Sequence, residues 1–325
     1  GSVTAFFDAN FSAEIKQLWN LFVHLFREKQ QEQEIIMLSQ GHFESIICML
    51  CKKIFKVDYG IVHHTQPKFF ELLRFRSKLS GRIHLKLYNL YIKNASFVQS
   101  LSKHVYTELK AIGLTENQIV HAGLGIDFEE LHLIHRDKFA IPTNLDSKFD
   151  LIMIGRLSWE KNYLTALNLF EQIVSWDSRF KLHIYGEGPM RYELERQLVH
   201  RKLTESVFLH GFSSSALNHL KLAHSLLHLS LTESYGQCLI EAFILRVPII
   251  TTNVGTASEL NSIVSELVYI LSSINFKEIQ ESLEQITGLN NRKVRNFSVD
   301  KLHHHDITVV FKKLSEFLMS LSTLK

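Results

Sequence analysis

Phe149-Asp150-Leu151-Ile152-Met153-Ile154-Gly155-Arg156 joins a run of large apolar residues directly to a glycine and a cation. A short apolar run that ends at a glycine is typical of a buried strand followed by a tight loop. The amphipathic stretch that follows is long enough for a helix. This part of the chain therefore predicts one strand–loop–helix unit.

The same alternation extends in both directions from this unit. Before it, strand-like runs lie at residues 3–7, 35–38, 59–63, 96–99 and 119–122; after it, at residues 181–185, 207–209, 226–231, 247–251 and 267–270. The alternation predicts an α/β fold with two Rossmann-like, doubly wound parallel sheets. Ligands of such sheets bind beyond the carboxyl ends of the strands, so we expect the functional residues in the strand-to-helix loops.

The two series predict an N-terminal domain at residues 1–140, a C-terminal domain at 141–300, and a C-terminal helix at 301–325 that crosses back to the first domain. Residues 134–148 hold proline and polar residues with little periodicity and are interpreted as the linker. His303-His304-His305 precedes the last helical pattern and is interpreted as a solvated helix start, with a metal site as the alternative. Cys48 and Cys51 fit the apolar face of a helix better than a redox or metal motif.

Composition excludes several classes of protein. The 325 residues are 46% hydrophobic and include 23 Phe, so the chain is not a disordered polymer. The 36 Lys and Arg residues barely outnumber the 33 Asp and Glu residues, which argues against nucleic acid as the main partner. No apolar run approaches the ~20 residues of a membrane span, no signal sequence is visible, and the three cysteines suit a reducing compartment. The initial Gly-Ser is typical of a cleaved tag. We expect a cytoplasmic protein, at most peripheral at the inner face of a membrane.

Cationic side chains follow the strand at 149–154. Gly155 allows close backbone approach, and Arg156 and Lys161 are placed to bind a diphosphate between them. Surface salt bridges are the alternative use of these two cations.

Two carboxylates flank a helix start after the strand at 226–231. Glu233 lies on the loop and Glu241 in the first turns of the following helix. Carboxylates accept paired hydrogen bonds from diols, so one could hold a ribose and the other a sugar, with the diphosphate at the helix N-terminus between them. Either residue alone could instead be a solvated or capping residue. The turn Gly186-Glu187-Gly188-Pro189 lacks the full dinucleotide fingerprint, which disfavours a nicotinamide dehydrogenase.

These motifs, taken in order, resemble the retaining GT-B glycosyltransferases of glycosyltransferase family four. The resemblance covers about residues 149–270 and rests on Gly155-Arg156, Lys161, Gly186-Glu187-Gly188-Pro189, His210-Gly211-Phe212, Glu233 with Glu241 and Pro248–Gly255. It implies a GT-B fold, two Rossmann-like domains facing a cleft, with the acceptor side in the first domain. It also implies a nucleotide-diphosphate sugar, with UDP favoured, as the donor substrate, and no obligatory cofactor.

The resemblance assigns roles to individual residues. Arg156 and Lys161 would bind the donor diphosphate, Glu233 the transferred sugar and Glu241 the ribose. Donor-binding positions would also include Gly155, Gly188, Pro189, Phe212, Gly236, Gln237 and Leu239. His64, after the strand at 59–63, resembles the family's histidine at the donor sugar, with a capping or surface role as its alternative. Residues 10–14, Asn-Phe-Ser-Ala-Glu, stand where the family has a Gly-Gly loop.

The implied reaction is hexosyl or N-acetylhexosaminyl transfer with retention of configuration. The chain has no Asp-x-Asp pair, so we expect no metal in the donor site, with cations and a helix N-terminus stabilising the leaving diphosphate. The expected acceptor is a glycan or lipid-linked glycan in cell-surface polysaccharide or glycolipid synthesis; a protein acceptor is an alternative. A nucleotide-sugar epimerase, a glycan phosphorylase and a non-catalytic GT-B subunit that partners another glycosyltransferase are the rival functions.

Residues 67–94 interleave seven basic residues with large apolar ones and contain one acid, Glu71. Ordinary helices with a solvated basic edge explain this pattern. Attachment to an anionic membrane surface explains it equally, and would bring a lipid-linked acceptor to the enzyme.

Overall fold

The computed structural model describes residues 36–62, 78–128, 148–287 and 299–323. The chain divides into two compact units. Unit 1 comprises Gly1–Ser100, Leu109–Val120 and Leu314–Lys325, and unit 2 comprises Leu101–Glu108 and His121–Lys313. Each unit has its own sheet and core.

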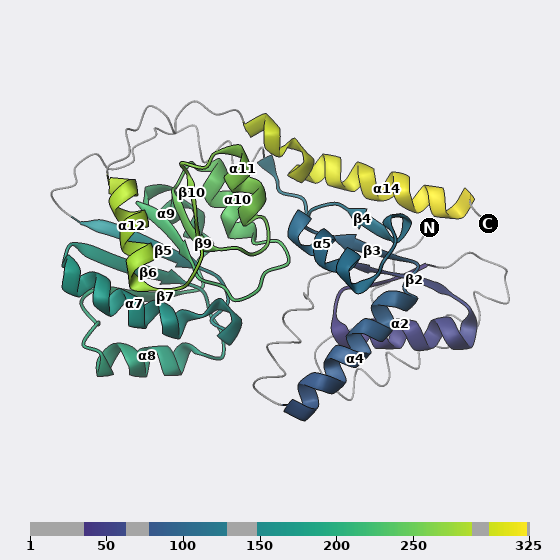
Figure 1. Ribbon diagram of the computed structural model, residues 1–325, viewed down its shortest axis with the longest axis horizontal. Helices are drawn as coiled ribbons and strands as arrows, with labels where there is room; N and C mark the ends of the chain where they lie inside the picture. Colours follow the sequence, from purple (N-terminus) through teal and green to yellow (C-terminus); the bar gives the residue numbers. More distant parts are fainter. Residues whose placement is uncertain (1–35, 63–77, 129–147, 288–298, 324–325) are drawn as a thin grey trace. The chain divides into compact units, whose positions relative to one another are not determined.

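Unit 2 contains a six-stranded sheet. Its strands are β5 (Phe149–Ile154), β6 (Phe180–Tyr185), β7 (Val207–Gly211), β8 (Ser225–His228), β9 (Ile249–Thr252) and β10 (Val268–Leu271). The spatial order is β10-β9-β8-β5-β6-β7, and every neighbouring pair is parallel. The chain therefore starts at the centre with β5, builds one half of the sheet outward, and returns to β5 with β8 to build the other half (Figure 1).

Two groups of helices cover this sheet. One contains α7 (Tyr163–Trp176), α8 (Arg191–His200) and α12 (Phe276–Thr287); the other contains α9 (Ala216–Leu222), α10 (Gln237–Ile244) and α11 (Ala257–Ile263). Right-handed crossovers on either side of the return to β5 place the groups on opposite faces. The core between them is apolar, with Leu151, Phe170 and Ile250 fully buried. Burial on both faces explains why these strands are continuous apolar runs in the sequence.

Unit 1 contains a four-stranded sheet of β1 (Ile36–Ser39), β2 (Asp58–Val62), β3 (Phe97–Ser100) and β4 (Ile119–His121), in that order. The first three strands are parallel. Helices α2 (His42–Phe55) and α4 (Lys78–Asn94) pack against each other, and the C-terminal helix α14 (Ile307–Thr323) contributes Phe317 to an edge contact with Phe97. Helix α5 (Lys103–Ile112) is divided between the two units. Cys48 and Cys51 lie on the buried side of α2, as predicted, and burial raises the pKa of the Cys48 thiol to about 12.

The α/β fold with two doubly wound sheets is confirmed. Each predicted strand within the described residues is present, with ends that differ by a few residues. The predicted strand at 3–7 and the linker, apart from its last residue, lie outside the described residues. The predicted domain boundaries stay a prediction. Among the described residues, none of the helices combines the length and apolarity that crossing a bilayer requires.

The interpretation of the histidine triplet as a solvated helix start is wrong for its last member. The triplet ends the 3-10 helix η3 (Val299–His305), and His305 is only 2% exposed. Its ring packs edge-on against Tyr235, a contact between segments 70 residues apart that the local helical pattern does not encode.

Gly186, at the end of β6, generates a prediction about stability. Its φ is +142°, and a Cβ there would lie 1.9 Å from the carbonyl oxygen of Gly155. Because this oxygen belongs to the backbone of the loop after β5, it cannot move away without shifting that loop. We expect Gly186→Ala to lower the free energy of unfolding by about 3 kcal/mol or more.

Gly211→Ala is the matched control, since Gly211 also has a positive φ, but a Cβ there meets the flexible Glu187 carboxylate. We expect it to cost about 1 kcal/mol. Urea unfolding followed by fluorescence of Trp159 and Trp176, both in unit 2, measures the two variants. Equal losses would show that the Gly155–Gly186 approach is not a constraint.

Candidate active site

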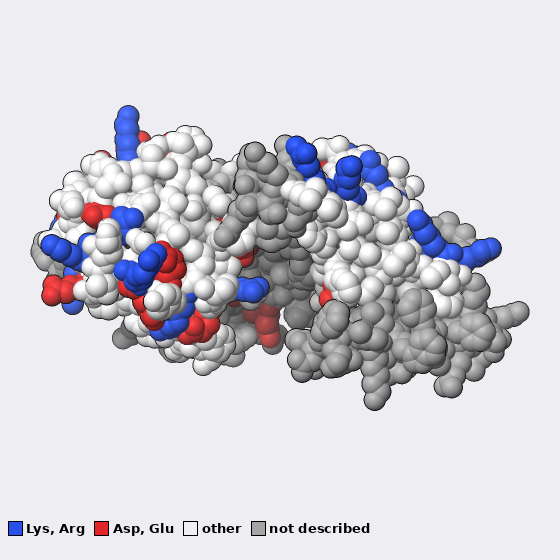
Figure 2. Space-filling model, turned by 90° about the horizontal axis from the view of Figure 1, so that it is seen from below, with Lys and Arg blue, Asp and Glu red and all other residues white. Residues whose placement is uncertain are grey.

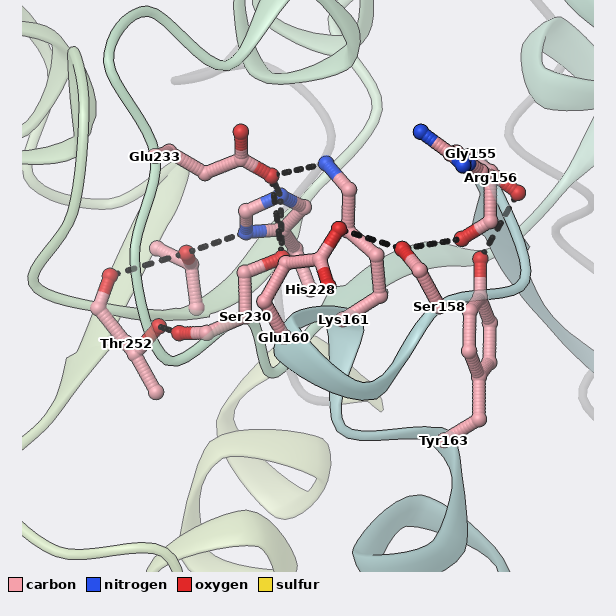
Figure 3. A network of polar contacts seen from close by, with 11 residues as sticks. Gly155, Arg156, Ser158, Glu160, Lys161, Tyr163, His228, Ser230, Glu233 and Thr252 are labelled. Carbon is pink, nitrogen blue, oxygen red and sulfur yellow. Dashed lines mark hydrogen bonds and ion pairs between the residues drawn. The ribbon is translucent and has the colours of Figure 1, made fainter. Parts of the chain in front are cut away.

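The loops that follow β5 and β8 meet at the point where the sheet order reverses. The backbone N–H of Leu231, after β8, donates to the carbonyl of Glu160 in the loop after β5, at 2.7 Å. The 3-10 helix η2 (Trp159–Lys161) lies in that loop and ends at Lys161. This contact brings side chains from the two halves of the sheet together (Figure 3).

Lys161 and Glu233 form an ion pair across the two loops, with the ammonium on the carboxylate oxygen Oε1. The Lys161 side chain is 21% exposed and the Glu233 side chain 14%. The same Oε1 accepts the Ser230 hydroxyl at 3.0 Å and lies 3.2 Å from His228 Nε2. This one carboxylate oxygen therefore has three donors around it (Figure 3).

His228 is buried behind Glu233 and is held from both ring nitrogens. The Thr251 hydroxyl donates to the carbonyl of Thr252 at 2.9 Å, so its oxygen accepts from His228 Nδ1 at 3.2 Å. Nε2 then donates to Glu233, and both nitrogens carry a proton. The ring is therefore an imidazolium that supports the Glu233 carboxylate.

The pKa values agree with this protonation pattern. Burial by itself would lower the pKa of His228, but contacts with Cys238 and Glu233 raise it to about 9. Burial by itself would raise the pKa of Glu233, but the His228 hydrogen bond and the Lys161 charge bring it down to about 2. Burial opposes and Glu233 favours the charged form of Lys161, whose pKa is raised. All three groups are charged at neutral pH.

His228 and Ser230 are not among the site residues predicted from the sequence. Both are polar residues inside an otherwise apolar run, Leu226–Leu231, and they stand two positions apart, so they share one side of an extended segment. Polar residues that alternate with apolar ones in a strand-like run are the pattern from which both could have been predicted.

The loop after β5 is fixed by its own backbone. Gly155 N–H donates to the Tyr185 carbonyl at 3.0 Å, and the Tyr163 hydroxyl donates to the Gly155 carbonyl at 2.9 Å. The Ser158 hydroxyl binds the Glu160 carboxylate. Arg156 is exposed, and no ion pair to it occurs among the described residues. Its guanidinium is thus available to an anion at this loop.

Helix α10 begins directly after Gly236, whose φ is +80°. Gln237 Nε2 donates to Glu241 Oε1 at 2.8 Å, which joins two of the predicted donor-binding side chains. Leu239 is fully buried, and its N–H donates to the Gly236 carbonyl at 2.9 Å. The Leu239 side chain is therefore part of the core and cannot contact a ligand directly.

The remaining predicted residues fall into two groups. Gly188 lies against the loop after β5, since a Cβ on it would be 2.5 Å from the Leu157 carbonyl oxygen. Pro189 and Phe212 are exposed, and no hydrogen bond or ion pair in the described parts of the chain links them to Lys161 or Glu233. His64 lies outside the described residues.

Comparisons with known proteins place this site in a family context. Residues 135–292, which include most of unit 2, match the family described as "Glycosyl transferases group 1". The 2-deoxystreptamine N-acetyl-D-glucosaminyltransferase of Niallia circulans is 30% identical over 37% of this chain and 31% of its own length. The poly(ribitol-phosphate) alpha-N-acetylglucosaminyltransferase of Staphylococcus aureus is 21% identical over 68% of this chain and 46% of its own. The chain thus spans less than half the length of these relatives.

A solved structure shows the same architecture. HepE from Anabaena, in complex with UDP and glucose, superposes with a TM-score of 0.69 over 94% of this chain and 81% of that chain, at 14% identity. The fold is GT-B, as the resemblance implied.

The raised pKa of His228 makes the free energy of unfolding depend on pH. The pKa of His228 is raised from 6.5 to about 9 in the folded state, so its contribution is complete below pH 6.5 and is lost as the pH rises through about 9. We expect the free energy of unfolding to fall by up to about 3 kcal/mol over this window. Urea unfolding followed by tryptophan fluorescence at both ends of the window measures this loss.

His228→Gln should remove most of that dependence, since its amide does not titrate. His200→Gln, on the exposed end of α8, is the control and should titrate like the wild type. If wild type and His228→Gln lost the same stability across the window, His228 would not be the titrating group.

Proposed function

We propose that the chain is a retaining glycosyltransferase that moves a sugar from a nucleotide-diphosphate sugar to an acceptor hydroxyl. The observation that carries this proposal is the Lys161–Glu233 pair at the reversal point of a six-stranded parallel sheet. That point is where nucleotide ligands bind in open α/β sheets. The family match over residues 135–292 and the UDP complex of a protein with the same fold support it.

The charges at the site suit a nucleoside diphosphate that departs while its sugar is transferred to the acceptor. The Lys161 ammonium has three N–H donors and pairs with Glu233. It can therefore also donate a hydrogen bond to a phosphate oxygen. Arg156 supplies the cation that no described acid neutralises. Positive groups aimed where charge develops stabilise the departing diphosphate. We therefore propose that Arg156 and Lys161 bind the diphosphate and that the donor site requires no metal.

The two carboxylates take the hydroxyls in this proposal. Glu233 is held rigidly by Lys161, His228 and Ser230 and accepts hydroxyls of the transferred sugar; Glu241 accepts those of the ribose. No protein nucleophile is required if the leaving phosphate takes the proton of the acceptor hydroxyl. The remaining proposed donor contacts are the backbone at Gly155, Gly188 and Gly236 and the side chains of Pro189, Phe212 and Gln237.

A non-catalytic GT-B subunit is the alternative, favoured by residues 10–14, which replace the Gly-Gly loop of the family. The discriminating experiment incubates the pure chain with a panel of UDP-, GDP- and ADP-sugars and measures released nucleoside diphosphate. Release from one donor, accelerated by a suitable acceptor, supports the enzyme. Donor binding without release from any of them supports the subunit.

Glu233→Gln and Lys161→Ala test the site. We expect each to lower kcat by about 10²–10³-fold, because each removes one electrostatic contact to the transition state. Lys277→Ala, on the exposed surface of α12, should keep wild-type turnover. Circular dichroism confirms that the variants fold. Near-normal turnover of either site variant with the identified donor would contradict the assignment.

The acceptor side of the proposal rests on α4. This helix contains Lys78, Arg82, Lys86 and Lys93 and no acidic residue, and it leaves Leu79, Ile83 and Leu90 exposed. Figure 2 shows Lys and Arg side chains on the face of unit 1 at the right, with few acidic ones. Basic residues beside exposed apolar ones suit the surface of an anionic bilayer. We propose that unit 1 docks on such a surface and that the acceptor is a lipid-linked glycan or glycolipid.

Vesicle co-sedimentation tests this docking. We expect binding to anionic vesicles and not to neutral ones, because each basic residue near the surface contributes about 1 kcal/mol. The Arg82→Glu, Lys86→Glu double variant should release the protein, whereas Lys277→Glu in unit 2 should not. Equal, negligible binding to both kinds of vesicle would make a soluble acceptor, such as a protein, the better proposal.

A further inference from the structure

A second cluster of polar side chains lies in unit 2, apart from the Lys161–Glu233 pair. It consists of Glu259 in α11 and His304 and His305 at the end of η3. One ligand atom from each lies within 4.8 Å of the others. Glu259 is 5% and His305 2% exposed, while the His304 side chain is 48% exposed. Two buried groups and one half-exposed group thus converge from segments 45 residues apart in the chain.

His305 has one ring nitrogen that lacks a hydrogen bond. Nδ1 lies 3.1 Å from the Tyr235 hydroxyl. Nε2 is buried and has no hydrogen-bond partner among the described residues, and it lies 3.9 Å from Glu259 Oε1. A buried polar atom without a partner is costly, so its persistence needs an explanation.

Glu259 completes the arrangement. Its Oε1 is 3.2 Å from His304 Nε2, and its Oε2 accepts the backbone N–H of Lys103 at 3.3 Å. Zn²⁺ binds nitrogen and oxygen at about 2.0–2.2 Å in tetrahedral geometry, which sets neighbouring ligand atoms about 3.3 Å apart. The Glu259–His304 distance already meets that spacing, and the Glu259–His305 distance exceeds it by less than 1 Å.

We propose that Glu259, His304 and His305 form a binding site for a divalent transition metal, with Zn²⁺ the best fit. Two imidazoles and one carboxylate suit Zn²⁺ rather than Mg²⁺ or Ca²⁺, which prefer oxygen ligands. The Tyr235 hydroxyl and the Lys103 N–H stand behind two of the ligands, as supporting contacts do in zinc sites. His304 lies on the exposed side, where a fourth ligand such as water can enter.

This metal would be structural and not part of sugar transfer. Bound there, it ties η3, which directly precedes α14, to α11. Through Tyr235 it also braces the loop that carries Glu233, since the Tyr235 carbonyl already accepts the Thr256 N–H at 2.9 Å. The proposal is independent of the proposed function, because metal binding and stability are measured without a donor sugar.

The test uses the full chain without an affinity tag, treated with chelator and dialysed. Titration with Co²⁺, followed by its visible absorption, and with Zn²⁺, by calorimetry, should show one equivalent bound, and Zn²⁺ should raise the Tm. Glu259→Gln and His304→Ala should each weaken the affinity at least about tenfold. His303→Ala, the exposed neighbour in the same triplet, and His183→Ala, from the separate His183–His210 pair, should bind like the wild type.

Several outcomes would overturn the proposal. The wild type could fail to bind either metal saturably. Glu259→Gln and His304→Ala could both retain wild-type affinity, or His303→Ala could lose as much as His304→Ala, which would indicate adventitious surface coordination. Should Glu259→Gln not fold, His304→Ala decides alone, because its side chain is half exposed and contributes little to packing.

Discussion

A single carboxylate oxygen, Glu233 Oε1, collects the side-chain contacts that join the two loops of the site. Burying a carboxylate is expensive unless donors replace its water, and Lys161, His228 and Ser230 supply three of them. Lys161 belongs to one half of the sheet and the other two residues to the other half. The Glu233 carboxylate therefore adds side-chain contacts to the Leu231–Glu160 backbone hydrogen bond that joins the loops after β5 and β8.

The order of the strands makes that requirement possible. Because β8 returns to pair with β5, the ends of two strands that are far apart in sequence become neighbours. The apolar faces of these strands are buried by two groups of helices, so the sheet edge keeps its geometry when side chains at the loops change. A rigid scaffold with charged residues on its loops is the arrangement on which binding sites are usually built.

Local patterns were sufficient to predict the fold and to single out two residues, Lys161 and Glu233, that the structure brings into contact. Apolar runs and their spacing predicted the strands, and strand-end loops led to Lys161 and Glu233, because both features are encoded within about ten residues of sequence. His228 and His305 could not be identified in this way. Each depends on a partner in another segment, Thr251 for His228 and Tyr235 for His305, and only the folded chain brings these partners together. The role of each residue in ligand binding depends further on the sugar-donor substrate, and the spacing of apolar residues carries no information about that substrate.

The charges around Glu233 show why the exposed arginine matters. Lys161 and His228 are balanced by Glu233 and Glu160, so these four side chains carry no net charge when all are ionised. An anion approaching the loops is therefore attracted mainly by the charge that remains, which is that of Arg156. Removing the Glu233 charge would instead leave the cations of Lys161 and His228 close together without the carboxylate between them. The same carboxylate thus maintains the site before any ligand arrives, and activity and folding of a Glu233 variant have to be measured together.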